Sequence, residues 1–244
     1  MPAAGAPGPQ FQVEDVELPD ADPALPARIR RMLDKHKAMW TGQARGVIKA
    51  TQHRIDLTAG ARPVRFAPRR AGHAAQEVEA AKVKRQLEAD FIEPTSSEWG
   101  FPVVLVPEKD GTLRFCVDYR LLNVVTKKDS YPLPRMDECI DSLGEATIFS
   151  TLDCNAGYWQ VAIAPEDREK TAFVCHEGAY QYKRMLFGLT NAPATFQRAL
   201  DIIFSGVKRQ SCLIYLDDVI GISRRRRSMW ATSIASYACC ATRE

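Results

Sequence analysis

The sequence lacks several features that would assign it to a common class of protein. No apolar run approaches the roughly 20 residues of a membrane-spanning helix, and Met1 is followed by Pro, Ala and Gly rather than by a basic and then apolar leader. The seven cysteines show no spacing typical of zinc ligands or a disulfide framework, and the four histidines are scattered. These absences predict an intracellular protein, in the cytoplasm or nucleus, that is not secreted and contacts no membrane.

The charge balance is equally uninformative by itself. A net charge of +3 is compatible with nucleic-acid binding but does not indicate it, because such binding requires clustered cations. The 244 residues could form one large domain or two small ones. The first 26 residues are rich in Pro, Ala and Asp, which predicts a disordered leader, and 27–40 is predicted to form a short basic helix. We therefore assign 1–50 to a leader with one short helix.

Two adjacent carboxylates, Asp217 and Asp218, stand between two apolar runs that are typical of buried strands. A hairpin with both residues in its turn places like charges against apolar surface, which is costly unless a cation neutralises them. Mg²⁺ or Mn²⁺ is the natural partner of such oxygen ligands. Taken alone, the stretch fits a solvated Asp-Asp turn without a function equally well.

A second β-prone run ends at Asp153 and is followed by a turn at 155–157. A carboxylate at a strand end can face a metal ion while its strand remains buried. Asp153 together with Asp217 would hold two metal ions. That arrangement activates a 3′-hydroxyl and stabilises a leaving pyrophosphate in phosphoryl transfer.

From Thr51 to Ser223 the chain resembles the reverse transcriptases of gypsy-class LTR retrotransposons. One matching stretch would be a weak signal, but six in the order and spacing of that family are highly specific. The six stretches are 91–99, 102–106, 109–120, 129–135, 187–197 and the Tyr-Leu-Asp-Asp sequence at 215–218. The resemblance implies an α/β (α+β) fold with the palm and fingers of a right-hand polymerase, in which an antiparallel palm sheet packs on helices.

The resemblance also implies an activity. A family member is an RNA-directed DNA polymerase, a nucleotidyltransferase that adds deoxynucleotides to a primer 3′-hydroxyl. It implies two Mg²⁺ or Mn²⁺ ions on Asp153, Asp217 and Asp218, of which Asp218 could act by shaping the site. The implied partners are an RNA or DNA template with its primer and deoxynucleoside triphosphates, and a cytoplasmic virus-like particle becomes a possible location. The oligomeric state stays open.

Several residues are implied to bind the nucleotide. Asp-Gly between the β-rich runs 102–107 and 112–118 predicts a hairpin, and the resemblance makes its cations Lys109 and Arg114 grip the triphosphate. Without the resemblance, they are ordinary charges of a solvated turn. Tyr158 would collide with a ribose 2′-hydroxyl and so select deoxynucleotides. A ring packed in the core is the alternative, and it is our prediction for the neighbouring Trp159.

The resemblance places four more residues. Phe187 and Gly188 would form the floor of the nucleotide site, where the missing side chain of Gly188 allows close approach. Gln197 and Tyr215 would lie towards the template or primer.

After Ser223 the likeness stops at four arginines, and we assign 224–244 to a tail outside the family. The arginines could form a nucleic-acid or import patch. We favour a changed reading frame, since shifted codons can be chosen that restore a family-like helix. We then expect the polymerase thumb to be missing and processive synthesis to be weak. A catalytically dead relic that at most binds nucleic acid is the competing hypothesis. An unrelated palm-type nucleotidyltransferase would share the metal site but explain none of the other stretches.

Overall fold

The computed structural model describes residues 30–31, 34–35, 46–109, 111–144, 146, 148–154, 156–206, 208 and 212–223. The described residues fall into two compact units. The first unit comprises 49–133 and 156–199, and the second comprises 134–154 and 200–223 together with the described residues before 49. Most of the helix predicted at 27–40 and the whole tail after Ser223 lie outside the described residues.

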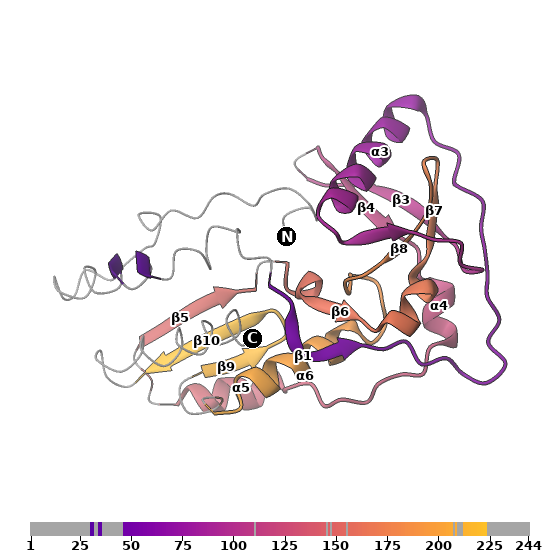
Figure 1. Ribbon diagram of the computed structural model, residues 1–244. Helices are drawn as coiled ribbons and strands as arrows, with labels where there is room; N and C mark the ends of the chain where they lie inside the picture. Colours follow the sequence, from indigo (N-terminus) through magenta and orange to yellow (C-terminus); the bar gives the residue numbers. More distant parts are fainter. Residues whose placement is uncertain are drawn as a thin grey trace. The chain divides into compact units, whose positions relative to one another are not determined.

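Most of the elements are labelled in Figure 1. Along the chain they are β1 (Ile48–His53), α3 (His73–Glu88), β2 (Ile92–Pro94), β3 (Phe101–Pro107), β4 (Leu113–Val117), α4 (Arg120–Val125), α5 (Met136–Leu143), β5 (Ile148–Asp153), η2 (Gly157–Gln160), β6 (Val161–Ile163), η3 (Pro165–Thr171), β7 (Phe173–Cys175), β8 (Gly178–Tyr182), α6 (Ala192–Ile203), β9 (Cys212–Tyr215) and β10 (Asp218–Ser223). The fold is thus mixed α/β, as predicted. No helix within the described ranges is long and apolar enough to cross a bilayer.

The first unit is built on a five-stranded sheet with the order β2-β8-β7-β3-β4. Only β3 and β7 pair in parallel, and the other neighbours are antiparallel. The hairpin predicted from Asp-Gly is confirmed as β3 and β4, with Val106 opposite Arg114. Helix α3 packs against β2 and β4 of this sheet (Figure 1). It ends at Glu88, and Asp90 follows with a positive φ of 58° that does not continue the helical backbone.

Aromatic side chains fill the core of the first unit. Phe101 and Tyr119 meet edge to face at 5.2 Å between ring centroids, and Phe173 lies 5.2 Å from Tyr182. All four rings are almost fully buried. The hydroxyl of Tyr119 donates to the carbonyl of Thr171 at 2.7 Å, so its burial leaves no polar atom without a partner. Each such side chain contributes about 1.5–3 kcal/mol through burial.

The second unit contains a three-stranded antiparallel sheet with the order β5-β10-β9. Strand β10 is central and pairs along its length with β5 (Figure 1). Cys212, Leu213 and Ile214 of β9 are consecutive buried residues. Such an uninterrupted apolar run is typical of a strand covered on both faces, which explains why it predicted a buried strand.

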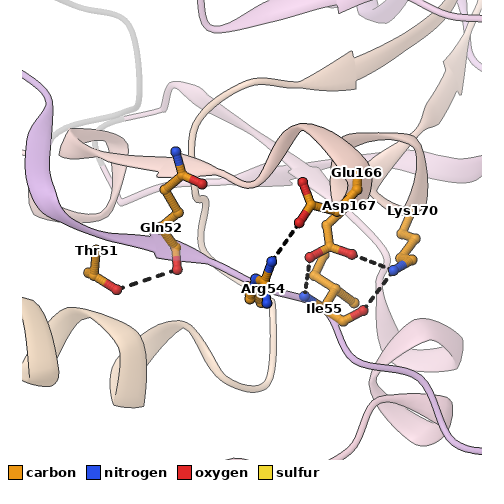
Figure 2. A network of polar contacts seen from close by, with 7 residues as sticks. All are labelled: Thr51, Gln52, Arg54, Ile55, Glu166, Asp167 and Lys170. Carbon is orange, nitrogen blue, oxygen red and sulfur yellow. Dashed lines mark hydrogen bonds and ion pairs between the residues drawn. The ribbon is translucent and has the colours of Figure 1, made fainter.

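A polar clasp joins the segment after β1 to η3 in the first unit (Figure 2). The amide of Ile55 donates to Asp167 Oδ2 at 3.0 Å, and Lys170 Nζ donates to the carbonyl of Ile55 at 2.9 Å and to Asp167 Oδ1. Asp167 is buried, whereas Arg54 and Glu166 form a second pair beside the clasp that is more than half exposed. The buried clasp therefore holds the chain in place, while the exposed pair adds little.

We predict that Asp167→Ala lowers the free energy of unfolding by about 3–5 kcal/mol, because it leaves the Ile55 amide without its acceptor and the charge of Lys170 without its counterion. Urea unfolding of the purified chain measures the change. Glu166→Ala is the matched control, since it removes a neighbouring carboxylate from an exposed pair and should leave stability unchanged. Equal effects of the two substitutions would contradict this account of the clasp.

Candidate active site

The Tyr-Leu-Asp-Asp sequence forms the tip of the β9–β10 hairpin in the second unit. Tyr215 pairs with Asp218, so the turn consists of Leu216 and Asp217 alone. The expectation that both carboxylates lie in the turn is therefore wrong, because Asp218 is the first residue of β10. Two-residue loops match the twist of antiparallel strands, and the register of β9 with β10 allows only these two residues to remain unpaired.

Leu216 has a positive φ of 51°, which is uncommon for a residue with a branched side chain. Such a conformation costs on the order of 1–3 kcal/mol and persists only where the surrounding structure imposes it. The paired strands on both sides of the turn supply that constraint. The same pairing of Tyr215 with Asp218 confines Asp217 to this turn.

Strand β5 brings the third acidic residue beside this turn. The Cα atoms of Asp153 and Asp218 are partners in the β5–β10 ladder, and paired residues of antiparallel strands lie roughly 4.5–5.5 Å apart. One residue further on, the amide of Cys154 donates to the carbonyl of Asp217 at 3.0 Å. The backbones of Asp153, Asp217 and Asp218 therefore meet at one end of the sheet, although Asp153 is distant from the others in sequence.

The acidic side chains of the hairpin differ in exposure. Asp217 is half-buried, and its Oδ1 atom is shielded from solvent, whereas Asp218 is exposed. Carboxylate oxygens are the ligands that Mg²⁺ and Mn²⁺ prefer, so the donor set fits a divalent ion. Among the described side chains, which do not include that of Asp153, no group of three or more His, Cys, Asp or Glu is placed to hold a metal. Ligation by the three aspartates stays a prediction.

Tyr158 lies in the first unit, within the 3-10 helix η2. Its ring stacks on Phe187 at 4.6 Å between centroids and lies 5.3 Å from Phe196 of α6. Tyr158 is 7% exposed, but Phe187 is 47% exposed and forms the outer face of this stack. Both the core role and the nucleotide role of Tyr158 are compatible with this packing. Trp159 is buried and stacks on Phe91, as predicted for a core residue.

Gly188 follows Phe187 with a φ of +96°, a conformation that L side chains rarely adopt. Its carbonyl accepts a hydrogen bond from Asn123 Nδ2 at 2.7 Å, and Asn123 Oδ1 accepts one from the amide of Thr190 at 2.9 Å. A Cβ atom at this position would meet nothing closer than 3.8 Å. Backbone conformation, rather than space, is thus the local reason for glycine here.

The two predicted triphosphate ligands lie at the tip of the β3–β4 hairpin of the first unit. Lys109 is exposed, while Arg114 is paired with Glu108 at 2.7 Å and remains 46% exposed. Arg114 would have to exchange this carboxylate for a phosphate in order to bind a nucleotide. Gly111 has a φ of +80° in the connecting turn, which explains the Asp-Gly signal.

The residues assigned to the template or primer differ in exposure. Gln197 is fully buried in the first unit, so an effect of this side chain on nucleic acid would have to pass through its neighbours. Tyr215, in the second unit, is half-buried at the end of β9. Contact of either residue with a template or primer stays a prediction.

One ion cluster of the first unit was not anticipated. Asp118 accepts hydrogen bonds from Arg120 at 2.7 and 2.8 Å and from Arg69 at 3.0 Å. The hydrogen bond from Arg120 lowers the pKa of Asp118 to about 2, so this carboxylate stays charged at neutral pH. The three residues line a cavity together with Phe66 and Leu121. Arg69 is remote from Asp118 in sequence, and no local pattern connects them.

Comparison with known sequences gives a consistent result. A family model described as "Reverse transcriptase (RNA-dependent DNA polymerase)" matches residues 106–241, more than half of the chain. The match continues past Ser223, the residue after which we expected the likeness to stop, and that boundary stays a prediction. The chain is 40% identical over 144 residues to the retrovirus-related Pol polyprotein of transposon 297 from Drosophila melanogaster, and 40% identical over 146 residues to that of transposon gypsy. Each alignment covers 57% of this chain and 14% of the polyprotein.

The fold also resembles solved structures. Foamy viral protease–reverse transcriptase in complex with an RNA/DNA hybrid superimposes with a TM-score of 0.74 at 18% identity, covering 91% of this chain and 30% of the viral one. Another form of that enzyme, in complex with double-stranded DNA, gives a TM-score of 0.71 at 21% identity, covering 91% and 39% of the two chains. The likeness agrees with the predicted polymerase fold.

We predict that Gly188→Ala lowers the free energy of unfolding by about 1–2 kcal/mol, because alanine is strained at a φ of +96°. Chemical denaturation measures the loss. Gly206→Ala is the control, since Gly206 has no positive φ and a Cβ there would meet nothing within 4 Å. The explanation by backbone conformation fails if both substitutions have the same effect.

Proposed function

The chain belongs to the reverse transcriptase (RNA-dependent DNA polymerase) family, and on this premise we propose that it carries the catalytic carboxylates of a Pol polyprotein. It spans 14% of the length of the two Drosophila relatives, so the proposal concerns one part of such a polyprotein. The reaction is the addition of a deoxynucleotide to a primer 3′-hydroxyl on an RNA or DNA template. The 3′-oxygen forms a bond to the α-phosphorus, and the bond to the leaving pyrophosphate breaks.

The register of β5 with β10 is the observation that carries this proposal. It brings Asp153 next to Asp218 and places Asp217 in the adjoining turn. Like charges at such spacing are unfavourable, and a function that needs concentrated negative charge accounts for them. A solvated turn would need neither the third carboxylate nor the strained Leu216.

Asp153, Asp217 and Asp218 would hold Mg²⁺ or Mn²⁺. Two such ions, when bound, lower the pKa of the primer hydroxyl and stabilise the charge of the departing pyrophosphate. The protein itself holds the carboxylates in position before the reaction begins. The β5–β10 ladder and the amide of Cys154 hold the backbone of Asp217 and Asp218, which limits reorganisation during the chemical step.

In this proposal the first unit binds the nucleotide. The ring of Phe187 is exposed, and the buried ring of Tyr158 stacks on it. Tyr158 would leave too little room for a ribose 2′-hydroxyl, which distinguishes RNA from DNA precursors. Arg114 would exchange Glu108 for a phosphate oxygen, with Lys109 beside it.

A catalytically dead relic is the alternative function. A relic that only binds nucleic acid would still need its folded core but would no longer need its catalytic carboxylates. All three aspartates are nevertheless present, and their strands pair in register. We therefore favour an active polymerase site over nucleic-acid binding alone.

We predict that Asp217→Asn lowers the rate of single-nucleotide addition by about 10²–10³-fold, because the amide removes a charge from the site where the reaction develops it. Primer extension with Mg²⁺ and one deoxynucleotide measures this rate. Asp141→Asn is the control, since Asp141 is exposed on α5 of the same unit and the chemical change is identical. If the unsubstituted chain adds no nucleotide even at high enzyme concentration, the relic is favoured.

We further predict that Tyr158→Ala increases the use of ribonucleotides relative to deoxynucleotides by about tenfold or more, because it opens space at the sugar. The measured quantity is the ratio of kcat/KM for the two triphosphates, which cancels a general loss of folded protein. An unchanged ratio would assign Tyr158 to the core alone.

A further inference from the structure

Five charged residues gather on the first unit, and none of them belongs to the candidate active site. Arg168 lies on η3, Lys183 and Arg184 follow β8, Asp90 lies in the turn after α3, and Glu93 lies on β2. We call this group the basic cluster. Its three cations and two carboxylates leave a net charge of +1.

The carboxylates of the basic cluster are already engaged. Asp90 accepts a hydrogen bond from Lys183 at 2.6 Å. Glu93 accepts one from Gln181 Nε2 at 2.8 Å and lies 3.5 Å from Arg168 Nη1, a long separation for an ion pair. Arg184 has no ion pair with any described residue. The carboxylates near the two arginines are therefore shared with other donors.

Three donor groups in this neighbourhood are shielded from solvent and have no acceptor within the described part of the chain. They are Nε of Arg168, Nη1 of Arg184 and the indole Nε1 of Trp159. Trp159 is 6% exposed, and its ring stacks on Phe91, the residue after Asp90. All three groups donate hydrogen bonds and none of them can accept one. Gln86, whose carbonyl accepts a hydrogen bond from the amide of Phe91, has a shielded Oε1 atom that is likewise without a partner among the described residues, so these donors outnumber the acceptors by three to one.

The free-energy cost of burying these donors indicates which chemical class of acceptor would bind to them. Burial lowers the pKa of Arg184. The nearby charge of Asp90 opposes this effect, and the charge of Arg168 adds to it. A water molecule could accept two hydrogen bonds but would not offset the repulsion between the guanidinium groups. An oxyanion supplies both acceptors and charge, and arginine is the side chain best suited to phosphate oxygens.

We propose that Arg168 and Arg184 form a phosphate-binding site on the first unit, separate from the residues that would bind the incoming nucleotide. The net charge of +1 in the basic cluster matches the single negative charge of a phosphodiester, which favours a nucleic-acid backbone over a free phosphate group. The side chains of Arg168 and Lys183 are each 25% exposed, so a backbone phosphate can reach the cluster from solvent. The nucleic-acid source rests on the proposed function, whereas the oxyanion site does not.

The site itself is tested with inorganic phosphate and the full 244-residue chain. Saturating phosphate should raise Tm by about 2–4 °C over chloride of equal ionic strength. Arg184→Met should abolish this difference, and Arg184→Lys, which keeps the charge but not the planar fork, should reduce it. Arg85→Gln is the matched control, since Arg85 is an exposed arginine on α3 of the same unit, and it should retain the full difference.

Two outcomes would overturn the site. One is the absence of a phosphate-specific rise in Tm in the unsubstituted chain. The other is an equal rise in all variants, which would mean general salt stabilisation or an adventitious ion only. Should Arg184→Met fail to fold, Arg184→Lys decides between these results, because it preserves the charge.

The source of the phosphate is tested with a short single-stranded oligodeoxynucleotide. For a backbone contact, Arg184→Met should lower the slope of log affinity against log salt by about 1, while Arg85→Gln should not. A phosphate effect without an oligonucleotide effect would overturn the phosphodiester assignment. Asp217→Asn separates this proposal from the polymerase proposal, because it should lower the rate of nucleotide addition and leave the phosphate effect on Tm intact.

Discussion

The pairing of β5 with β10 is the constraint on which the candidate active site depends. It sets the backbone of Asp153 against Asp218 and links Cys154 to Asp217 through a backbone hydrogen bond. Neighbouring carboxylates repel one another, and the strained Leu216 adds to the cost of the turn. The buried strands on either side compensate for these costs, because they bury Val219, Ile214 and their neighbours when they pair.

In the first unit, an exposed aromatic ring is held on a rigid support. The stack of Tyr158 on Phe187, backed by Phe196, provides this support through ring packing. Gly188 follows with a positive φ, and the side chain of Asn123 forms hydrogen bonds with the carbonyl of Gly188 and the amide of Thr190. The buried clasp of Asp167 and Lys170 fixes the segment after β1. Rigid supports of this kind reduce the reorganisation that binding would otherwise require.

Much of the fold was predicted from local patterns. The β3–β4 hairpin, strand β5 ending at Asp153, and strands β9 and β10 around Asp217 lie where apolar runs and turn residues placed them. Strand β6 and the 3-10 helix η2 were not predicted, because elements of three or four residues are too short to show a period. Strand β1 and the 3-10 helix η3 were not predicted either. The turn at Tyr-Leu-Asp-Asp was misplaced by one residue, since the register of a hairpin is set by pairing and not by composition.

The sequence by itself identified the family and predicted the catalytic aspartates and the nucleotide-site residues, because each is encoded in a short contiguous stretch. Only the tertiary structure decided that Asp218 belongs to a strand, that Asp153 lies beside it, that Gln197 is buried, and that Arg168 and Arg184 belong to one cluster. The reason is physical. Local side-chain patterns fix which residues prefer a strand, a helix or a turn, whereas contacts between distant segments arise from the burial of apolar surface that many segments share.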